Sequence, residues 1–124
     1  MNRLLRTAAH VGLAMAATFG ALAATASPAA AANPVKNCYN TDYCVVDGPG
    51  FGGGTMSIDI DAIGGPGETA YFSLRRPGVT ACSGEFGTND PPRSWVCHNL
   101  PAGNYYLEVS RLGRARNWAI GLRY

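Results

Sequence analysis

The spacing of the four cysteines in this chain limits the chemistry that they can perform. Zinc sites place cysteines and histidines in close pairs such as C-x-x-C, and the sequence has no such pair. The only histidine after residue 32 is His98. We therefore predict disulfides and no metal site. Four cysteines allow three connectivities, and closeness in sequence around turn-forming residues favours two local bridges, Cys38–Cys44 and Cys82–Cys97.

Catalytic residues are hard to assemble from this sequence. Nucleophile and base catalysis needs a positioned histidine, and His98 stands beside a cysteine at a predicted strand end. Asp59 and Asp61 alternate outward on one predicted strand, as solvated residues do. No glycine-rich stretch has the spacing of a phosphate-binding loop followed by a helix. We expect no catalytic residue and no cofactor.

The first 32 residues have the order of a secretory signal peptide. Arg3 and Arg6 precede an alanine-rich apolar run, and residues 27–32 offer small-residue cleavage sites. We place cleavage after Ala32, within several residues. A retained membrane anchor is the alternative, but glycines interrupt the run. The sequence thus predicts a secreted, extracellular protein, in a compartment that favours disulfides.

Cleavage would leave residues 33–124 as a single small domain without net charge. Both signal-peptide arginines are lost, so eight basic residues face eight acidic ones. A nucleic-acid or membrane partner then lacks its simplest electrostatic support. The basic residues gather late in the chain, and residues 111–116 carry three arginines that form either a solvated face or a binding patch.

Alternating side chains predict that an all-β fold positions these residues. Glycine and proline interrupt the chain too often for a helix. Period-two alternation predicts half-buried antiparallel strands at residues 55–61, 105–110 and 118–124. Residues 69–75 also resemble residues 117–123 at an offset of 48 positions. Two related Greek-key units packed face to face would explain this weak repeat.

One stretch of the chain resembles the secreted actinomycete metalloproteinase inhibitors of βγ-crystallin-like fold. Cys38 and Cys44 are followed by a strand and a glycine-rich turn with Phe51-Gly52-Gly53, and residues 71–82 resemble the strand that leads to the family's third cysteine. The likeness spans residues 36–98. It implies a two-motif Greek-key β-sandwich of βγ-crystallin type with two disulfides. It also implies a monomer that inhibits an extracellular protease, in the first place a thermolysin-like zinc metalloprotease.

In that family the second disulfide closes a tight loop that carries the reactive bond. Here Cys82 and Cys97 enclose fourteen residues. By resemblance, the inhibitory loop would present an extended backbone to the protease, with a rigid shape that lowers the entropic cost of binding. The expected inhibitory residues are Cys82 and Ser83 at the reactive bond, Gly84, Glu85 as a metal-facing oxygen, and Phe86 as an apolar anchor. Alternatively, Phe86 is a buried turn aromatic.

Two other functions fit parts of the sequence. A killer-toxin-like antimicrobial or cell-surface binder would use the arginines of residues 111–116 with Trp118 and Tyr124. A carbohydrate-binding or structural module is suggested by residues 100–109, which resemble a strand of the β-sandwich domains appended to secreted peptidases. Crystallin-type calcium sites have their nearest counterpart at residues 89–94, where Arg93 replaces a hydroxyl.

Overall fold

The computed structural model describes residues 33–111 and 114–124, so the predicted signal peptide lies outside the described residues. Within this range the chain forms eight strands and no helix. None of the described residues belongs to a helix long and apolar enough to cross a membrane. The strands are β1 (Val35–Thr41), β2 (Tyr43–Phe51), β3 (Gly54–Ile63), β4 (Thr69–Arg76), β5 (Val79–Gly87), β6 (Arg93–Leu100), β7 (Gly103–Ser110) and β8 (Arg116–Arg123).

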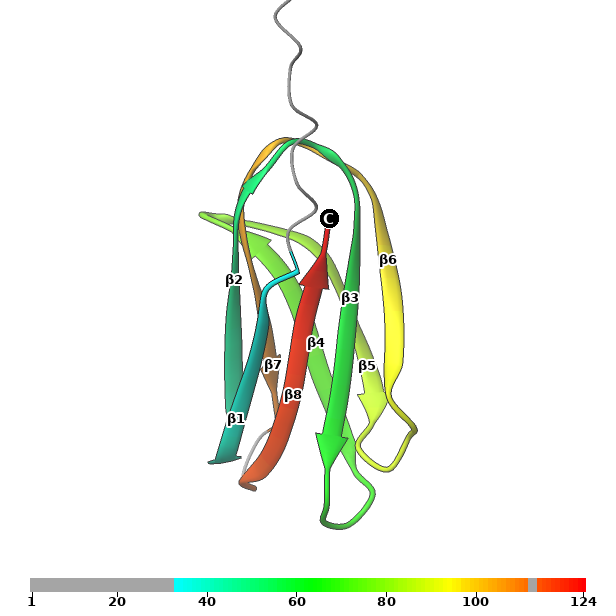
Figure 1. Cartoon of the computed structure of the whole chain (residues 1–124). Coiled ribbons are helices and arrows are strands. Elements are labelled where there is room, and N and C mark those ends of the chain that lie inside the picture. Colours follow the sequence, from blue (N-terminus) through cyan, green and yellow to red (C-terminus); the bar gives the residue numbers. More distant parts are fainter. Residues whose placement is uncertain (1–32, 112–113) are drawn as a thin grey trace, which may run out of the picture.

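Two four-stranded antiparallel sheets pack face to face (Figure 1). Sheet A has the order β1-β8-β3-β6, and sheet B has the order β2-β7-β4-β5. Six of the seven connections between successive strands cross from one sheet to the other, and only β4 and β5 form a hairpin within one sheet. This is the strand order of a jelly roll, a sandwich made of two Greek keys. The predicted all-β Greek-key sandwich with two disulfides is confirmed.

The strand order contains an internal symmetry. If four is added to each strand number of sheet A, counting on from β8 to β1, the result is the strand order of sheet B read in the opposite direction. Strands β4 and β8, where the sequence repeat lies, therefore occupy equivalent interior positions. The two halves do not form separate units packed face to face, as the repeat suggested, because successive strands alternate between sheets and each sheet mixes both halves.

The core lies between the sheets and follows the predicted alternation. On β3, Met56, Ile58 and Ile60 are buried, and on β8 so are Trp118, Ile120 and Leu122. The side chains between them face outward on the same strands. Period-two alternation with one apolar face thus supplies both inner walls of the sandwich.

The two predicted disulfides are confirmed, and both connect the sheets. Cys38 on β1 is bonded to Cys44 on β2, and Cys82 on β5 is bonded to Cys97 on β6. These four strands are the edges of the two sheets, so one bridge closes each open side of the sandwich. Such covalent stabilisation suits a domain with a small core and is typical of proteins from oxidising compartments.

Candidate functional site

The residues expected to form an inhibitory loop lie in a strand. Residues 82–86 belong to β5, whose register with β4 pairs Ser83 with Ser73 and Glu85 with Tyr71. Only residues 88–92 separate β5 from β6. The interpretation of this segment as an irregular loop is wrong, because its backbone hydrogen bonds are made with β4.

Phe86 does not form an exposed anchor. It is 7 % exposed, and its ring centroid lies 5.6 Å from that of Trp95 and 6.3 Å from that of Trp118. Period-two alternation turns Gly84 inward as well, where the Phe72 ring leaves no space: a Cβ on Gly84 would lie 2.7 Å from it. Phe86 is the buried aromatic of the alternative interpretation.

Ser83 and Glu85 remain exposed, on the outer face of sheet B. Their cross-strand neighbours are Ser73 and Tyr71 on β4. Between these four side chains lies a shallow hollow of about 350 Å³. The outward half of the expected inhibitory segment therefore contributes to a binding surface formed by two strands.

A row of side chains continues this surface across the whole of sheet B. Tyr43 on β2 pairs with Ser110 on β7, which pairs with Tyr71 on β4, which pairs with Glu85 on β5. Adjacent strands lie about 4.8 Å apart, so the backbones of the two tyrosines are separated by about 10 Å. Tyr43 is 48 % exposed and Tyr71 is 50 % exposed. The short serine between them leaves both rings accessible.

The neighbouring rows add charge to the same face. Arg75 Nη1 lies 3.9 Å from Glu108 Oε2, and Tyr106 pairs with Arg75 across β7 and β4. Partial burial raises the pKa of the Tyr43 phenol, and Glu108 and Tyr106 raise that pKa further, whereas Arg75 lowers it. We name this surface the tyrosine face; it consists of Tyr43, Tyr71, Ser73, Arg75, Ser83, Glu85, Tyr106, Glu108 and Ser110.

This composition is suited to binding a protein. Tyrosine supplies a large, rigid contact surface at low entropic cost, and serine supplies adaptable hydrogen bonds, as in antibody paratopes. Among the residues that the structure describes, no group of three or more histidine, cysteine or acidic side chains is arranged to hold a metal ion. At the calcium-like stretch, Asp90 Oδ2 accepts a hydrogen bond from the Gly87 N–H at 3.0 Å and caps the turn.

The likeness of this chain to known proteins is distant and lies in solved structures. No family model matches the chain, and no curated protein matches it. Among solved structures, PliG from Aeromonas hydrophila, a periplasmic lysozyme inhibitor of g-type lysozyme, is similar with a TM-score of 0.45 and 14 % sequence identity. The match covers 74 % of this chain and 83 % of that chain. A likeness this distant carries no argument about partners, so the site is judged on its own residues.

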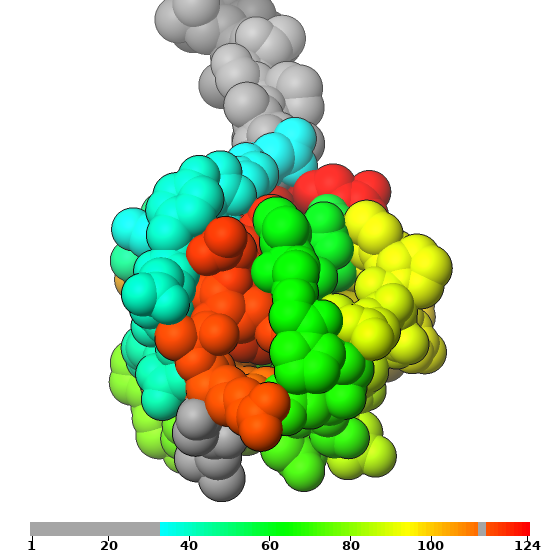
Figure 2. All heavy atoms as spheres, turned by 90° about the horizontal axis from the view of Figure 1, so that it is seen from below, coloured from blue at the N-terminus to red at the C-terminus, as the bar shows by residue number. Residues whose placement is uncertain are grey.

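The late arginines form a second site, at one end of the sandwich. A hollow of about 280 Å³ opens between the start of β8 and the β3–β4 connection, and Figure 2 shows this end of the molecule hollowed between orange and green segments. Arg111, Arg114 and Arg116 line it. The aromatics expected to join them do not: Trp118 is buried in the core, and the Tyr124 hydroxyl donates to the Pro49 carbonyl at 2.8 Å.

Tyr43, Tyr71 and Ser110 were not expected from the sequence to share one surface. Alternation in the sequence at residues 71–75 and 106–110 predicts that Tyr71 and Ser110 face outward, whereas residues 43–46 are all apolar and give no such signal for Tyr43. That pattern does not identify the neighbouring strands. Their meeting depends on the order β2-β7-β4-β5, which joins segments from both halves of the chain.

Proposed function

We propose that this protein is a secreted inhibitor that binds an extracellular protease through the tyrosine face. The observation that carries the proposal is the row Tyr43, Ser110, Tyr71 and Glu85, in which two half-exposed tyrosines stand on one sheet. Disulfides hold both edges of this sheet to the opposite sheet. A surface that is already rigid loses little entropy when it binds.

The proposed target is a thermolysin-like zinc protease. In the complex, Tyr71 takes the part of the apolar anchor that Phe86 cannot take, and the Glu85 carboxylate beside it approaches the protease metal. Both side chains are exposed and are cross-strand neighbours. Their position beside the edge of sheet B lets them enter a cleft while the rest of the face covers its rim.

The test is a titration of the mature protein against a thermolysin-like enzyme and, in parallel, a subtilisin-like enzyme. We expect inhibition of the zinc enzyme, weakened at least tenfold by Tyr71→Ala, since aromatic anchors dominate protein interfaces. Glu85→Gln should weaken it as well. The matched control is Tyr39→Ala, which removes a 72 % exposed tyrosine from β1 in sheet A.

Two results would contradict the proposal. If the folded protein inhibits neither enzyme, the function is wrong. If Tyr39→Ala and Tyr71→Ala weaken inhibition equally, the tyrosine face is not the contact surface. Inhibition of the subtilisin-like enzyme alone would support the inhibitor function, but it would show that a zinc protease is not the target.

A further inference from the structure

The hollow lined by Arg111, Arg114 and Arg116, here called the arginine hollow, has more positive than negative charge in its lining. It is formed by the β3–β4 connection, the end of β1 and the start of β8. Three of its lining residues are arginines, and one, Glu68, is acidic. Arg111 and Arg114 both pair with Glu68, the second at 3.3 Å between Nη1 and Oε1. The lining therefore carries a formal excess of two positive charges.

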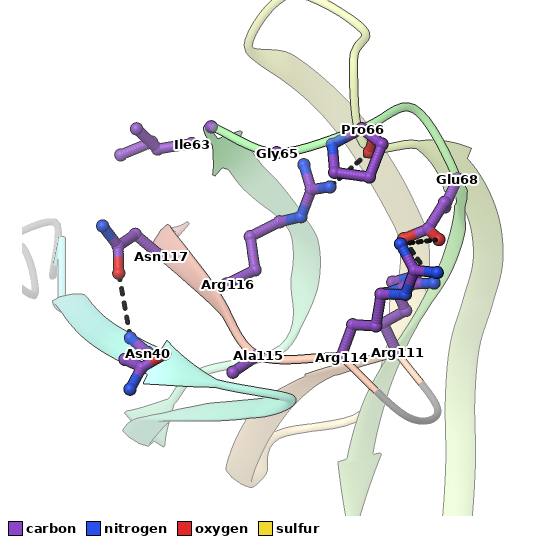
Figure 3. A pocket seen from close by; sticks show the side chains of 11 residues that line it. Asn40, Ile63, Gly65, Pro66, Glu68, Arg111, Arg114, Ala115, Arg116 and Asn117 are labelled. Atoms are coloured by element: carbon purple, nitrogen blue, oxygen red, sulfur yellow. Dashed lines mark hydrogen bonds and ion pairs between the residues drawn. The ribbon is translucent and has the colours of Figure 1, made fainter.

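Arg116 supplies one of these uncompensated charges. It is 6 % exposed, and its guanidinium donates to the carbonyl oxygens of Thr88, at 3.2 Å, and Pro66. Among the described residues it has no carboxylate partner. Burying a guanidinium without a counter-ion is costly, so a bound anion would stabilise this arrangement. Figure 3 shows Arg116 extending toward Pro66 on one side of the hollow.

Arg111 and Asn117 offer further hydrogen-bond donors. The Arg111 side chain is 11 % exposed, and its buried Nη1 has no hydrogen-bond partner among the described residues. Asn117 Oδ1 accepts a hydrogen bond from the Asn40 backbone N–H at 2.9 Å, which leaves its amide nitrogen as a donor. Arg111 and Asn117 line the space of about 280 Å³ from opposite sides, with Arg116 between them.

We infer that this hollow binds a small oxyanion with two negative charges, of the phosphate class. Guanidinium groups match phosphate oxygens in charge and geometry, and a dianion equals the formal charge excess of the lining. The volume suits one phosphate group, with the ester-linked remainder of a larger ligand left in solvent. This inference does not depend on the proposed protease contact.

The test is titration of the mature protein with inorganic phosphate, followed by calorimetry and by thermal unfolding at constant ionic strength set with chloride. We expect saturable binding and a rise in melting temperature of about 7 °C at ten times the dissociation constant. Glycerol 3-phosphate forms a second arm: binding of both ligands assigns the site to free and esterified phosphate, and binding of inorganic phosphate alone assigns it to the free ion.

Variants then locate the binding. Arg114→Gln changes a side chain that is 63 % exposed, and we expect it to weaken phosphate binding about tenfold. Asn117→Asp, which adds a negative charge, should weaken it further. The matched control is Arg76→Gln at the opposite end of β4. Phosphate stabilisation that chloride reproduces, or that Arg76→Gln reduces as much as Arg114→Gln does, would overturn the inference, and so would binding of neither ligand.

Discussion

Arg123 on β8 donates two hydrogen bonds to Asp59 on β3, across the outer face of sheet A. Arg123 Nε donates to Oδ2 at 2.6 Å, and Nη2 donates to Oδ1 at 2.8 Å. The Ser94 hydroxyl donates to the same carboxylate from β6. One carboxylate therefore ties three neighbouring strands of sheet A together, although both charged side chains are well exposed.

This pair predicts a dependence of stability on pH. Hydrogen bonding from Arg123 holds the pKa of the Asp59 carboxyl below its ordinary value. Its contribution is therefore fully present above the unfolded-state pKa of about 4 and is lost as pH falls through the lower folded-state pKa. The effect should be small because solvent screens the pair. Urea unfolding of wild type and Asp59→Asn should differ at pH 6, and the difference should shrink as the pH falls below about 4.

The control for this experiment is Asp61→Asn, two residues along the same strand, since Asp61 forms no ion pair with the described residues. A wild-type advantage over Asp59→Asn that grows as the pH falls from 6 to 3 would contradict the assigned role of the pair.

The disulfide between β5 and β6 should contribute strongly to stability. Replacing Cys82 and Cys97 by alanine frees the edges of both sheets on that side. The chain-entropy model predicts a loss of about 3 kcal/mol in the free energy of unfolding. Removing Cys38 and Cys44 should cost about 2 kcal/mol, because that bridge closes a shorter loop. Urea unfolding measures both, and a larger loss for the shorter loop would be inconsistent with the model.

Gly84 is predicted to resist substitution for a steric reason. An alanine Cβ there would lie 2.7 Å from the Phe72 ring inside the sandwich, so Gly84→Ala should lower the free energy of unfolding by about 1 to 3 kcal/mol. Gly52→Ala is the control, since a Cβ there meets no atom within 4 Å. Equal unfolding midpoints for the two variants would show that the Phe72 ring moves freely.

Phe86→Ala separates the stability of the fold from the proposed binding. Loss of this buried ring from its contacts with Trp95 and Trp118 should cost about 3 to 5 kcal/mol. Per folded molecule, inhibition should remain close to wild type, because Phe86 lies beneath the tyrosine face. Unfolding curves and inhibition below the melting temperature test this together. If a fully folded Phe86→Ala variant inhibits the protease much more weakly than wild type, Phe86 belongs to the contact surface after all.

Local patterns in the sequence were sufficient for much of the fold. Alternation on β3, β7 and β8 predicted both the strands and their buried faces, because the side-chain period of a strand is a local property. The disulfide pairs were also predictable, since each joins strands that are adjacent in the chain. At β5, Gly84 interrupts the apolar face with a position that has no side chain, and this hid the strand that buries Phe86.

By itself, then, the sequence determined a β-sandwich and the residues that face its core. The tertiary structure decided which strands became neighbours, and thereby brought Tyr43, Tyr71 and Glu85 into one row and Arg116 beside the carbonyl groups of Pro66 and Thr88. Strand order depends on pairings between distant segments, and period-two alternation is the same whichever neighbour a strand receives. Both candidate sites arise from this order.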